Sequence, residues 1–322
     1  MADVAEVANV SSQTVWRVIN GSGAVSQVTR DRVLAAIEVT GYRLNLAARR
    51  LSTRKSSAIG ILAASTADYG PTRSLFAVEQ AVREAGYFPL VTSAQPGRVR
   101  ESLDFLLSQA IEALAVIAPY RRTLQEVAAV GATIPITVLQ AGIGGNVSSV
   151  AVDQRAGTRL AVEHLVELGH RRIQHLAGPP DFIDSGLRHA AFATEIDRAG
   201  LVLGGEIHGD WSADSGHAAA GAVDRGTTAV FCGNDQMAIG LIHGFADRGL
   251  RVPDDISVLG FDDIPEARHS LPPLTTVNQD FAAVGRRAAH ALIESLALGQ
   301  QPGTIAVPPR LIVRASTAEP GR

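Results

Sequence analysis

The chain has 322 residues and a formal net charge of −3, and 46% of its residues are hydrophobic. This length predicts about two domains plus a smaller one, and the composition excludes a disordered chain. There is no run of eighteen apolar residues, which excludes a membrane span, and the acidic N-terminus lacks the basic start of a secretion signal. The single cysteine, Cys232, excludes a disulfide framework and a cysteine metal cluster. We therefore expect a cytoplasmic protein.

Charge is distributed unevenly between the start of the chain and the rest. Residues 1–55 carry eight Lys or Arg side chains and four Asp or Glu side chains, a balance of +4, so the remainder of the −3 total is −7. A basic head on an acidic body is typical of a nucleic-acid-binding segment joined to a domain with a different task. If charge were the only sign, a solvated charged face would be the simpler interpretation.

Three short helices are predicted in this basic segment. The first covers residues 3–8, and the second covers residues 12–20 with Ser11 as its N-cap. The third starts at Ser26 or Thr29 and stops before Gly41, a residue type that commonly ends helices. Two short helices joined by a tight turn form the helix-turn-helix pattern of DNA-binding proteins.

The second helix has an apolar face and a polar face. Val15, Val18 and Ile19 follow the i, i+3, i+4 spacing and are expected to pack on the other helices. On the opposite face, Gln13 can pair with adenine and Arg17 with guanine, each contributing about 1–3 kcal/mol of base discrimination. Contacts to phosphate, sugar or thymine methyl groups are expected from the other residues of this region, namely Ser12, Thr14, Trp16 and Asn20. A solvated helix is the alternative.

These residues resemble the headpiece of the lactose-repressor/galactose-repressor family of bacterial transcriptional regulators. The similarity runs through Asp3-Val-Ala, Val10-Ser, Gln13-Thr-Val, Arg17-Val-Ile-Asn20, Val25-Ser, Thr29-Arg and Gly41-Tyr-x-x-Asn45. The resemblance implies a DNA-binding hinge over residues 45–56, in which Leu51 wedges into the minor groove and bends the DNA. It also implies DNA contacts from Thr29, Asn45, Ala48 and Arg49. Trp16 departs from the family pattern, which commonly has a small residue there.

From Ala58 onward, apolar strands alternate with amphipathic helices. The predicted strands cover residues 58–64, 88–93, 113–118, 134–139, 148–152, 172–177, 228–232 and 256–260. This alternation predicts an α/β fold with two doubly wound parallel-sheet lobes, and ligands in such folds bind at the carboxyl ends of strands. The fold class is thus a small all-α helix-turn-helix headpiece followed by two lobes that resemble periplasmic sugar-binding proteins.

The resemblance also implies the domain boundaries. The headpiece spans residues 1–44, the hinge helix and linker 45–56, and the effector-binding and dimerisation domain 57–322. Within that domain, lobe one covers about 57–153 plus 279–308, and lobe two covers about 154–278 plus 309–322.

The sequence contains no complete motif of enzyme chemistry. A Walker lysine loop, a Gly-x-Ser-x-Gly elbow and a His-Glu-x-x-His zinc pattern are all missing, and Gly142-Ile-Gly144-Gly145 is only a fragment of a dinucleotide fingerprint. Cys232, in the strand Ala-Val-Phe-Cys, fits a core residue better than a nucleophile. We therefore expect a binding protein without catalytic residues, a metal site or a cofactor.

Polar and aromatic side chains near the predicted strand ends indicate a carbohydrate site. Asn234 follows one strand, with Asp235 expected to cap the next helix, and Asp262 and Asp263 end another strand with carboxylates that can accept paired hydroxyls. Arg188 can donate through its planar guanidinium, and Trp211 offers a flat apolar face to a sugar ring.

In this part of the chain, the motifs are closest to those of the galactoside-binding member for which the family is named. They are Gly209-Asp-Trp-Ser-Ala, Asn234-Asp-Gln-Met-Ala, Ser257-Val-Leu-Gly-Phe-Asp-Asp263 and Pro272-Pro-Leu-Thr-Thr-Val-Asn-Gln-Asp-Phe281. The resemblance implies hydroxyl contacts from Arg188, Asn234 and Asp262, apolar contacts from Trp211 and Phe281, and Gln279 nearby. Gln140 replaces a carboxylate that touches the sugar in that member. No leucine heptads end the chain, so we expect a dimer.

Together these features predict a homodimeric, cytoplasmic, nucleoid-associated repressor. It would bind a pseudo-palindromic operator and be released by a galactoside-like sugar bound between its lobes. Within the same family, a purine or a sugar phosphate is the alternative effector. A transport-type sugar-binding protein and a doubly wound kinase or dehydrogenase are the rivals from other classes, and the basic headpiece and the missing nucleotide loop disfavour them.

Overall fold

The computed structural model of the chain describes residues 1–20, 23, 25–42, 56–63, 68–94, 97–131, 133–140, 147–299 and 303–321. The chain divides into two compact units, Met1–Ser56 and Ser57–Arg322. In the described part of the chain, no helix combines the length and the apolar character needed to cross a membrane.

The described part of the first unit contains three helices around a small apolar core. They are α1 (Ala2–Val7), α2 (Ser12–Asn20) and α3 (Gln27–Thr40). The core is formed by one face of each helix, through Val4, Ala5, Ala8, Val15, Val18, Val33 and Ala36. The Ser11 hydroxyl accepts a hydrogen bond from the Thr14 amide at 3.1 Å, which confirms the predicted cap, and Gly41 ends α3 with a left-handed φ of 61°.

The second unit has two lobes. The first of them, which we call lobe one, is built on a six-stranded parallel sheet with the order β11-β5-β4-β3-β1-β2. Its strands are β1 (Ala58–Ala63), β2 (Phe88–Ser93), β3 (Ala113–Ile117), β4 (Ile136–Val138), β5 (Ser148–Val152) and β11 (Thr304–Val307). Its helices are α5 (Tyr69–Glu84), α6 (Val99–Ser108), α7 (Arg121–Ala129) and α12 (Phe281–Leu298).

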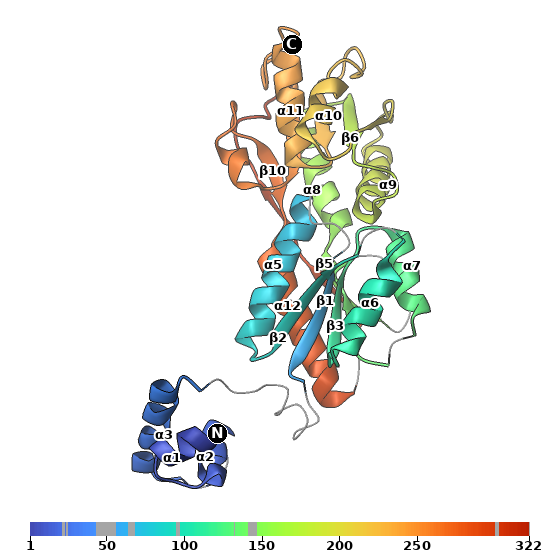
Figure 1. Cartoon of the computed structure of the whole chain (residues 1–322). Coiled ribbons are helices and arrows are strands. Elements are labelled where there is room, and N and C mark those ends of the chain that lie inside the picture. Colours follow the sequence, from blue (N-terminus) through green and yellow to red (C-terminus); the bar gives the residue numbers. More distant parts are fainter. Residues whose placement is uncertain are drawn as a thin grey trace. The chain divides into compact units, whose positions relative to one another are not determined.

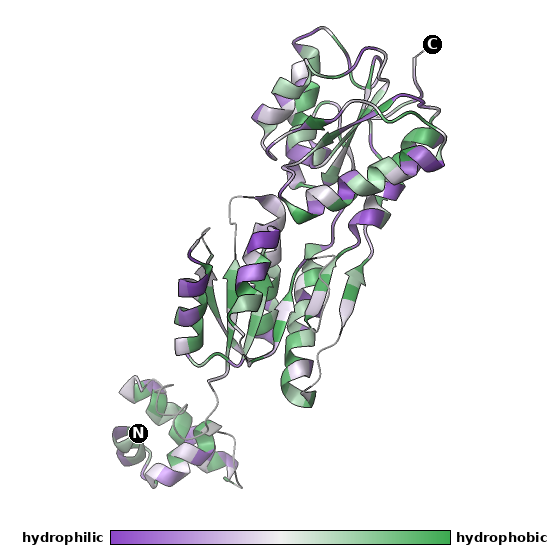
Figure 2. Cartoon of the chain, turned by 90° about the vertical axis from the view of Figure 1, so that its right-hand side faces the viewer, coloured by the Kyte–Doolittle hydropathy of each residue, from purple (hydrophilic) through white to green (hydrophobic). Residues whose placement is uncertain are grey.

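Helices cover both faces of this sheet. Helices α5 and α12 lie side by side on one face, and α6 and α7 cover the other (Figure 1). The alternation along β1 explains this arrangement, because Ile59 and Ile61 pack in the core with α5 and α12 while Ala58 and Leu62 pack with α6. A strand buried on both faces is apolar throughout, as the sequence predicted, and Figure 2 shows such hydrophobic strands between helices with hydrophilic outer faces.

The second part, lobe two, has a six-stranded sheet with the order β12-β10-β9-β8-β6-β7. Its strands are β6 (Ile173–Ala177), β7 (Ile207–His208), β8 (Ala229–Cys232), β9 (Ser257–Asp262), β10 (Thr275–Asn278) and β12 (Arg310–Ile312). Its helices are α8 (Gln154–Glu167), α9 (Ile183–Arg198), α10 (Ala213–Ala219), α11 (Asp235–Ala246) and the 3₁₀ turn η1 (Pro265–Arg268). Helices α8 and α9 pack on one face of this sheet, and α10 and α11 pack on the other.

The sequence did not predict four of the twelve strands, β7, β10, β11 and β12. Each has four residues or fewer, and β12 pairs antiparallel with β10, so lobe two has one antiparallel edge strand on an otherwise parallel sheet. The chain passes between the lobes at three places, after β5, after β10 and after β11. Side chains at the first two of these crossings help to form the cavity described next.

Candidate functional site

The exposed face of α2 is the candidate DNA-reading surface. Gln13 and Arg17 are exposed, Trp16 is 41% exposed, and Val15 and Val18 are buried against the other helices. The structure thus places the predicted base-reading side chains on the solvent side of an anchored helix. Ser12 is also exposed on α2, Thr14 is half-buried, and Thr29 lies in the first turn of α3.

Several predicted DNA contacts lie outside the described residues. They are the hinge positions Asn45, Ala48, Arg49 and Leu51 and the side chain of Asn20. Their roles remain predictions from the family resemblance.

The second unit contains a cavity of about 260 Å³ with walls from both lobes. Lobe one contributes residues from the start of α5, the ends of β3 and β4 and the start of α12, and lobe two contributes residues from α9 and the ends of β8 and β9. All seven predicted effector-binding residues line it, and they are Gln140, Arg188, Trp211, Asn234, Asp262, Gln279 and Phe281. This is the strand-end location expected for ligands of doubly wound folds.

Arg188 is the central cation of this cavity. Its side chain extends from α9 and is only 4% exposed, with its guanidinium carbon 3.9 Å from the centre of the Phe261 ring. Nε donates to Gln154 Oε1 at 2.9 Å and Nη1 donates to the Gly233 carbonyl. Nη2 lies 4.0 Å from Asp262 Oδ1, which is too long for a direct hydrogen bond. A ligand hydroxyl can therefore meet this N–H donor and this acceptor together.

The crossings after β5 and after β10 are joined by side-chain amides. Gln154, after β5, donates to Gln279 Oε1 at 2.9 Å, and Gln279, after β10, donates to Asp262 Oδ1 at 2.6 Å. All three side chains are buried. Because each group in the chain of hydrogen bonds fixes the next, the Asp262 carboxylate is held in a defined orientation.

Burial controls the charge of the cavity wall. Removal from water raises the pKa of Asp262 to about 6, although the nearby Arg188 charge and the Gln279 hydrogen bond act in the opposite direction. Burial also raises the pKa of Asp184, against the opposing effects of Arg188 and Gln140. The pKa of the Arg188 guanidinium is lowered by burial and supported by Asp262 and Asp184. The wall is thus a desolvated cluster in which carboxylates outnumber the cation.

Aromatic side chains supply the apolar surfaces. Trp211 is 9% exposed and packs edge-on against Phe182 with ring centroids 5.2 Å apart, and Phe281 packs edge-on against Tyr69 at 6.0 Å. Trp211 has a φ of 75° and Asp262 a φ of 114°, in the left-handed region that favours glycine. Such backbone conformations cost about 1–3 kcal/mol and concentrate at ligand sites.

A side-chain hydrogen bond joins the two lobes at the cavity. Gln140, which follows β4 in lobe one, donates through Nε2 to Asp184 Oδ1 on α9 in lobe two. Gln140 also accepts a hydrogen bond from the Ser149 hydroxyl at its backbone carbonyl, at 3.1 Å. The first lobe therefore offers an amide where the resemblance implied a carboxylate, and the acidic group of this pair is on the second lobe.

Two details of the sequence prediction are wrong. Asn234, rather than Asp235, caps α11, because its Oδ1 accepts from the Met237 amide at 2.9 Å. Asp235 is buried and accepts from the Ile264 amide at 2.8 Å and from the Thr276 hydroxyl. Asp263 does not line the cavity and instead forms an ion pair of 2.6 Å with Arg314. Only one carboxylate of the Asp262–Asp263 pair is thus available to a ligand.

Comparison with known families and proteins assigns both parts of the chain. Residues 1–45 match the model of the bacterial regulatory proteins of the lacI family, and residues 162–317 match a periplasmic binding protein-like domain. The chain is 35% identical over 328 residues to the lactose operon repressor of Escherichia coli K12, covering 99% of this chain and 90% of that protein. The chain belongs to the lacI family. It is a DNA-binding transcriptional repressor of that family.

Another named repressor and a solved structure also match this chain over nearly its whole length. The transcriptional repressor PurR of Haemophilus influenzae is 30% identical over 326 residues, covering 98% of this chain and 97% of that protein. A crystal structure of the Lac repressor dimer bound to operator and the anti-inducer ONPF superimposes with a TM-score of 0.90 at 34% identity, covering 98% of each chain. The match confirms the predicted fold class and family resemblance.

Sequence reasoning did not identify the other residues that line the cavity of this lacI-family protein, among them Gln154, Asp184, Phe182 and Tyr69. Gln154 is the second residue after the strand predicted over residues 148–152, so its position near a strand end was the available signal. Phe182 is the N-cap of α9, and Asp184 lies in its first turn, one turn before Arg188. Cys232 is fully buried in the core of lobe two, and burial raises the pKa of its thiol, which fits a packing role.

Proposed function

We propose that this protein is a repressor that a small neutral sugar, galactoside-like in shape, releases from its operator. The charge of the cavity wall carries this proposal. Within the described residues Arg188 is the one cation that lines the cavity, whereas its carboxylates are Asp68, Asp184, Asp210 and Asp262. A wall with this excess of acceptors suits a neutral ligand rich in hydroxyl donors and disfavours an anion.

The wall offers each kind of contact that a sugar ring requires. A hydroxyl at Asp262 would donate to the carboxylate and accept from Nη2 of Arg188, across their 4.0 Å separation. Trp211 and Phe281 would cover the apolar faces of the ring from the two lobes. Gln140 and Asp184 would contact the other end of the sugar. Because Gln140 stands where the family resemblance implies a carboxylate, this end would determine specificity.

A purine is the second candidate, because a repressor named PurR is 30% identical to this chain and the aromatic wall can stack a flat base. A sugar phosphate fits less well. Arg73, the first-lobe cation that the sequence offered, lies exposed on α5 and does not line the cavity. No catalytic role is proposed, since the relatives are regulators.

The DNA-binding half of the proposal rests on α2. Two headpieces of a homodimer would grip a pseudo-palindromic operator in the cytoplasm, where Gln13 and Arg17 read bases in successive major grooves. The hinge, with Leu51 as its wedge, would dock in the minor groove between them. The similar Lac repressor structure contains a dimer bound to operator.

Release requires the sugar to prefer one arrangement of the lobes. The Gln140–Asp184 hydrogen bond joins the lobes across the cavity, so a sugar hydroxyl that replaces it would change the balance between lobe arrangements. A near-complete switch requires about 10⁴-fold tighter binding to the released state.

A thermal melt of the purified protein against galactosides, glucosides, pentoses, sugar phosphates and purines tests the proposal. A ligand at about 100 times its Kd adds about 2.7 kcal/mol to the free energy of unfolding, which raises Tm by several degrees. We expect a shift with a neutral sugar, and that sugar must then release operator DNA in a gel-shift assay. A shift only with phosphates or only with purines would refute the sugar proposal.

A further inference from the structure

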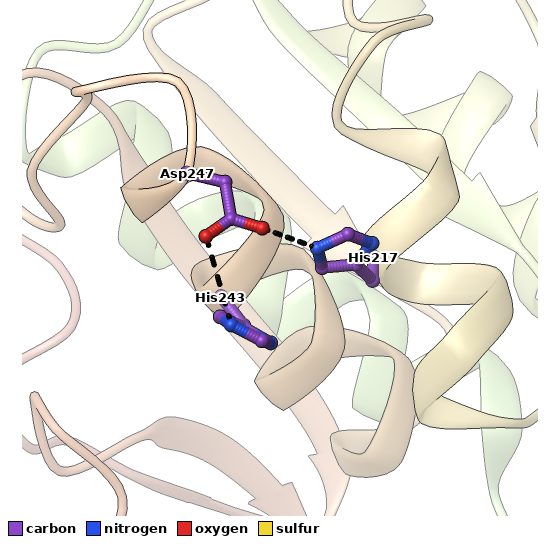
Figure 3. Close-up of side chains that lie close together, drawn as sticks. All are labelled: His217, His243 and Asp247. Atoms are coloured by element: carbon purple, nitrogen blue, oxygen red, sulfur yellow. Dashed lines mark hydrogen bonds and ion pairs between the residues drawn. The ribbon is translucent and has the colours of Figure 1, made fainter.

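Two histidines and an aspartate converge on the surface of lobe two, away from the effector cavity walls. His217 on α10 and His243 on α11 both point toward the carboxylate of Asp247, which follows α11 (Figure 3). His217 Nε2 is 2.8 Å from Asp247 Oδ2, and His243 Nε2 is 3.7 Å from Oδ1. One potential ligand atom from each residue lies within 4.8 Å of the others. Their side chains are 39%, 71% and 54% exposed, so an ion in solution can reach them.

Close packing of α10 against α11 holds this cluster together. A Cβ added at Gly244 would lie 2.5 Å from the His217 carbonyl oxygen, and one added at Gly240 would lie 2.9 Å from Ala213 Cα. Only glycine allows the two helix backbones to approach this closely. His217 is therefore held beside His243 in the last turn of α11 and Asp247 at its C-cap, which are four residues apart. Sites carried by packed helices keep their geometry better than sites on loops.

We propose that His217, His243 and Asp247 bind one divalent late transition-metal ion of the Zn²⁺, Ni²⁺ or Co²⁺ type. Two imidazoles and a carboxylate are a ligand set that suits these ions, with water completing the coordination. Tetrahedral coordination at about 2.0–2.1 Å separates the ligand atoms by about 3.3–3.4 Å. The two imidazoles lie 2.8 and 3.7 Å from different oxygens of Asp247, close to this value, so rotations of the exposed side chains complete the site. Hard cations such as Mg²⁺ prefer oxygen ligands and are excluded by the same chemistry.

Asp247 provides the carboxylate of the cluster. Its Oδ2 accepts a hydrogen bond from His217 Nε2 at 2.8 Å, which fixes the carboxylate beside this imidazole. The neighbouring guanidinium of Arg248 donates to the Gly244 carbonyl at 2.8 Å. Without an ion, an exposed His–Asp pair contributes little to stability. The arrangement is thus better suited to holding an ion than to stabilising the fold by itself.

Two other histidine arrangements provide controls. His290 and Glu294 on α12 form the same i, i+4 pair, with a separation of 3.7 Å, and are not part of such a three-residue cluster among the described residues. His189 and His208 both approach Glu206, but their ring centroids are 6.3 Å apart, compared with 4.9 Å for His217 and His243. Geometry therefore distinguishes the proposed site from both.

An ion here would connect α10 to α11. Helix α10 starts two residues after Trp211, and Asn234 caps α11, so both helices begin at the effector cavity. Metal binding is therefore expected to stabilise the part of lobe two that carries this wall. The metal proposal does not depend on which effector the cavity binds.

Isothermal titration of ZnCl₂ and NiCl₂ into the full chain, prepared without a histidine tag, tests the proposal. We expect one ion per chain and a higher Tm with metal, but no heat with MgCl₂. His217→Ala and His243→Ala should each weaken binding by about tenfold or more, because loss of a ligand costs at least as much as loss of a group that orients one. His290→Ala should bind like the wild-type chain.

Three results of this titration would contradict the proposal. They are the absence of binding, wild-type affinity in His217→Ala, or a loss of affinity in His208→Ala equal to that in His217→Ala. All of these positions are at least partly exposed, so the metal-free variants should melt like the wild type. If His217→Ala melts lower without metal, His243→Gln replaces it as the deciding variant, and wild-type affinity there refutes the site.

Discussion

Replacement of Gly178 by alanine tests whether the Trp211 ring is part of the effector site. A Cβ at Gly178 would overlap that ring, and even Cζ3, the most distant of the three nearest ring atoms, would lie 2.5 Å away. An ordinary carbon–carbon separation of about 3.5–4.0 Å requires the ring to move by about 1 Å or more. Gly233 and Phe182 lie against the same ring, so they oppose this movement and it costs free energy. Overpacking of this kind costs about 1–3 kcal/mol of stability.

The expected result separates the two halves of the protein. Gly178→Ala should weaken binding of the sugar identified in the melting panel by about tenfold, which corresponds to about 1.4 kcal/mol. Operator affinity without sugar should remain unchanged, because α2 belongs to the other compact unit. The chain has two tryptophans, so Trp16→Phe leaves Trp211 as the only one. In this background, the fluorescence emission of Trp211 should move to longer wavelength in Gly178→Ala.

Gly186→Ala is the matched control. Nothing lies within 4 Å of a Cβ at this position, and it lies inside α9, where alanine is better than glycine by about 0.5–1 kcal/mol. This variant should keep the Trp211 emission and the sugar affinity of the parent. Unchanged sugar affinity and unchanged emission in Gly178→Ala would refute the role assigned to the Trp211 ring.

Three further predictions concern the two sites. Arg17→Ala should relax operator specificity by about 1–3 kcal/mol at one base pair, and unchanged discrimination among single-base operator variants would contradict its role. Trp211→Ala should abolish the sugar response but not operator binding, and release of DNA at the wild-type sugar concentration would exclude the proposed site. Since the ionised form of Asp262 accepts the sugar hydroxyl and its pKa is about 6, sugar affinity should fall as pH decreases through 6, by about tenfold at pH 5. Without sugar, the free energy of unfolding should instead rise as pH decreases from 6 toward 4, because the raised pKa of Asp262 makes its protonation stabilise the fold. In Asp262→Asn, the Kd for the sugar should lack this pH dependence.

Local rules were sufficient for the headpiece and for most strands. The bounds of α2 follow from the 3.6-residue spacing of Val15, Val18 and Ile19 and from the Ser11 cap, which are interactions within one turn of the chain. Buried strands such as β1 and β3 are continuous apolar runs, so they were found as well. The short strands β7 and β12 carry too few residues for a periodic signal and form only where a neighbouring strand offers an edge.

The residue types at the effector site were visible in the sequence, but their partners were not. Asn234, Asp262 and Arg188 stand at strand ends or just inside a helix, where a fold of this class exposes them to a ligand. That Asp262 faces the cavity while Asp263 pairs with Arg314 is decided by a contact across 51 residues. The cap on α11 depends on a local choice between Asn234 and Asp235, and burial of Asp235 against Thr276 decides it.

By itself, the sequence determined the helices, the alternating order of the fold, the family and the types of residue at the site, because caps, periodicity and motifs act over a few residues. Only the tertiary structure decided which charges share the cavity. The Gln154–Gln279 hydrogen bond spans 125 residues and the Gln140–Asp184 bond spans 44, and His217 meets Asp247 only because glycines let two helices touch. Such contacts join residues that are far apart in the sequence and form only when the lobes and helices pack. A pattern within a few residues of the chain therefore cannot predict them.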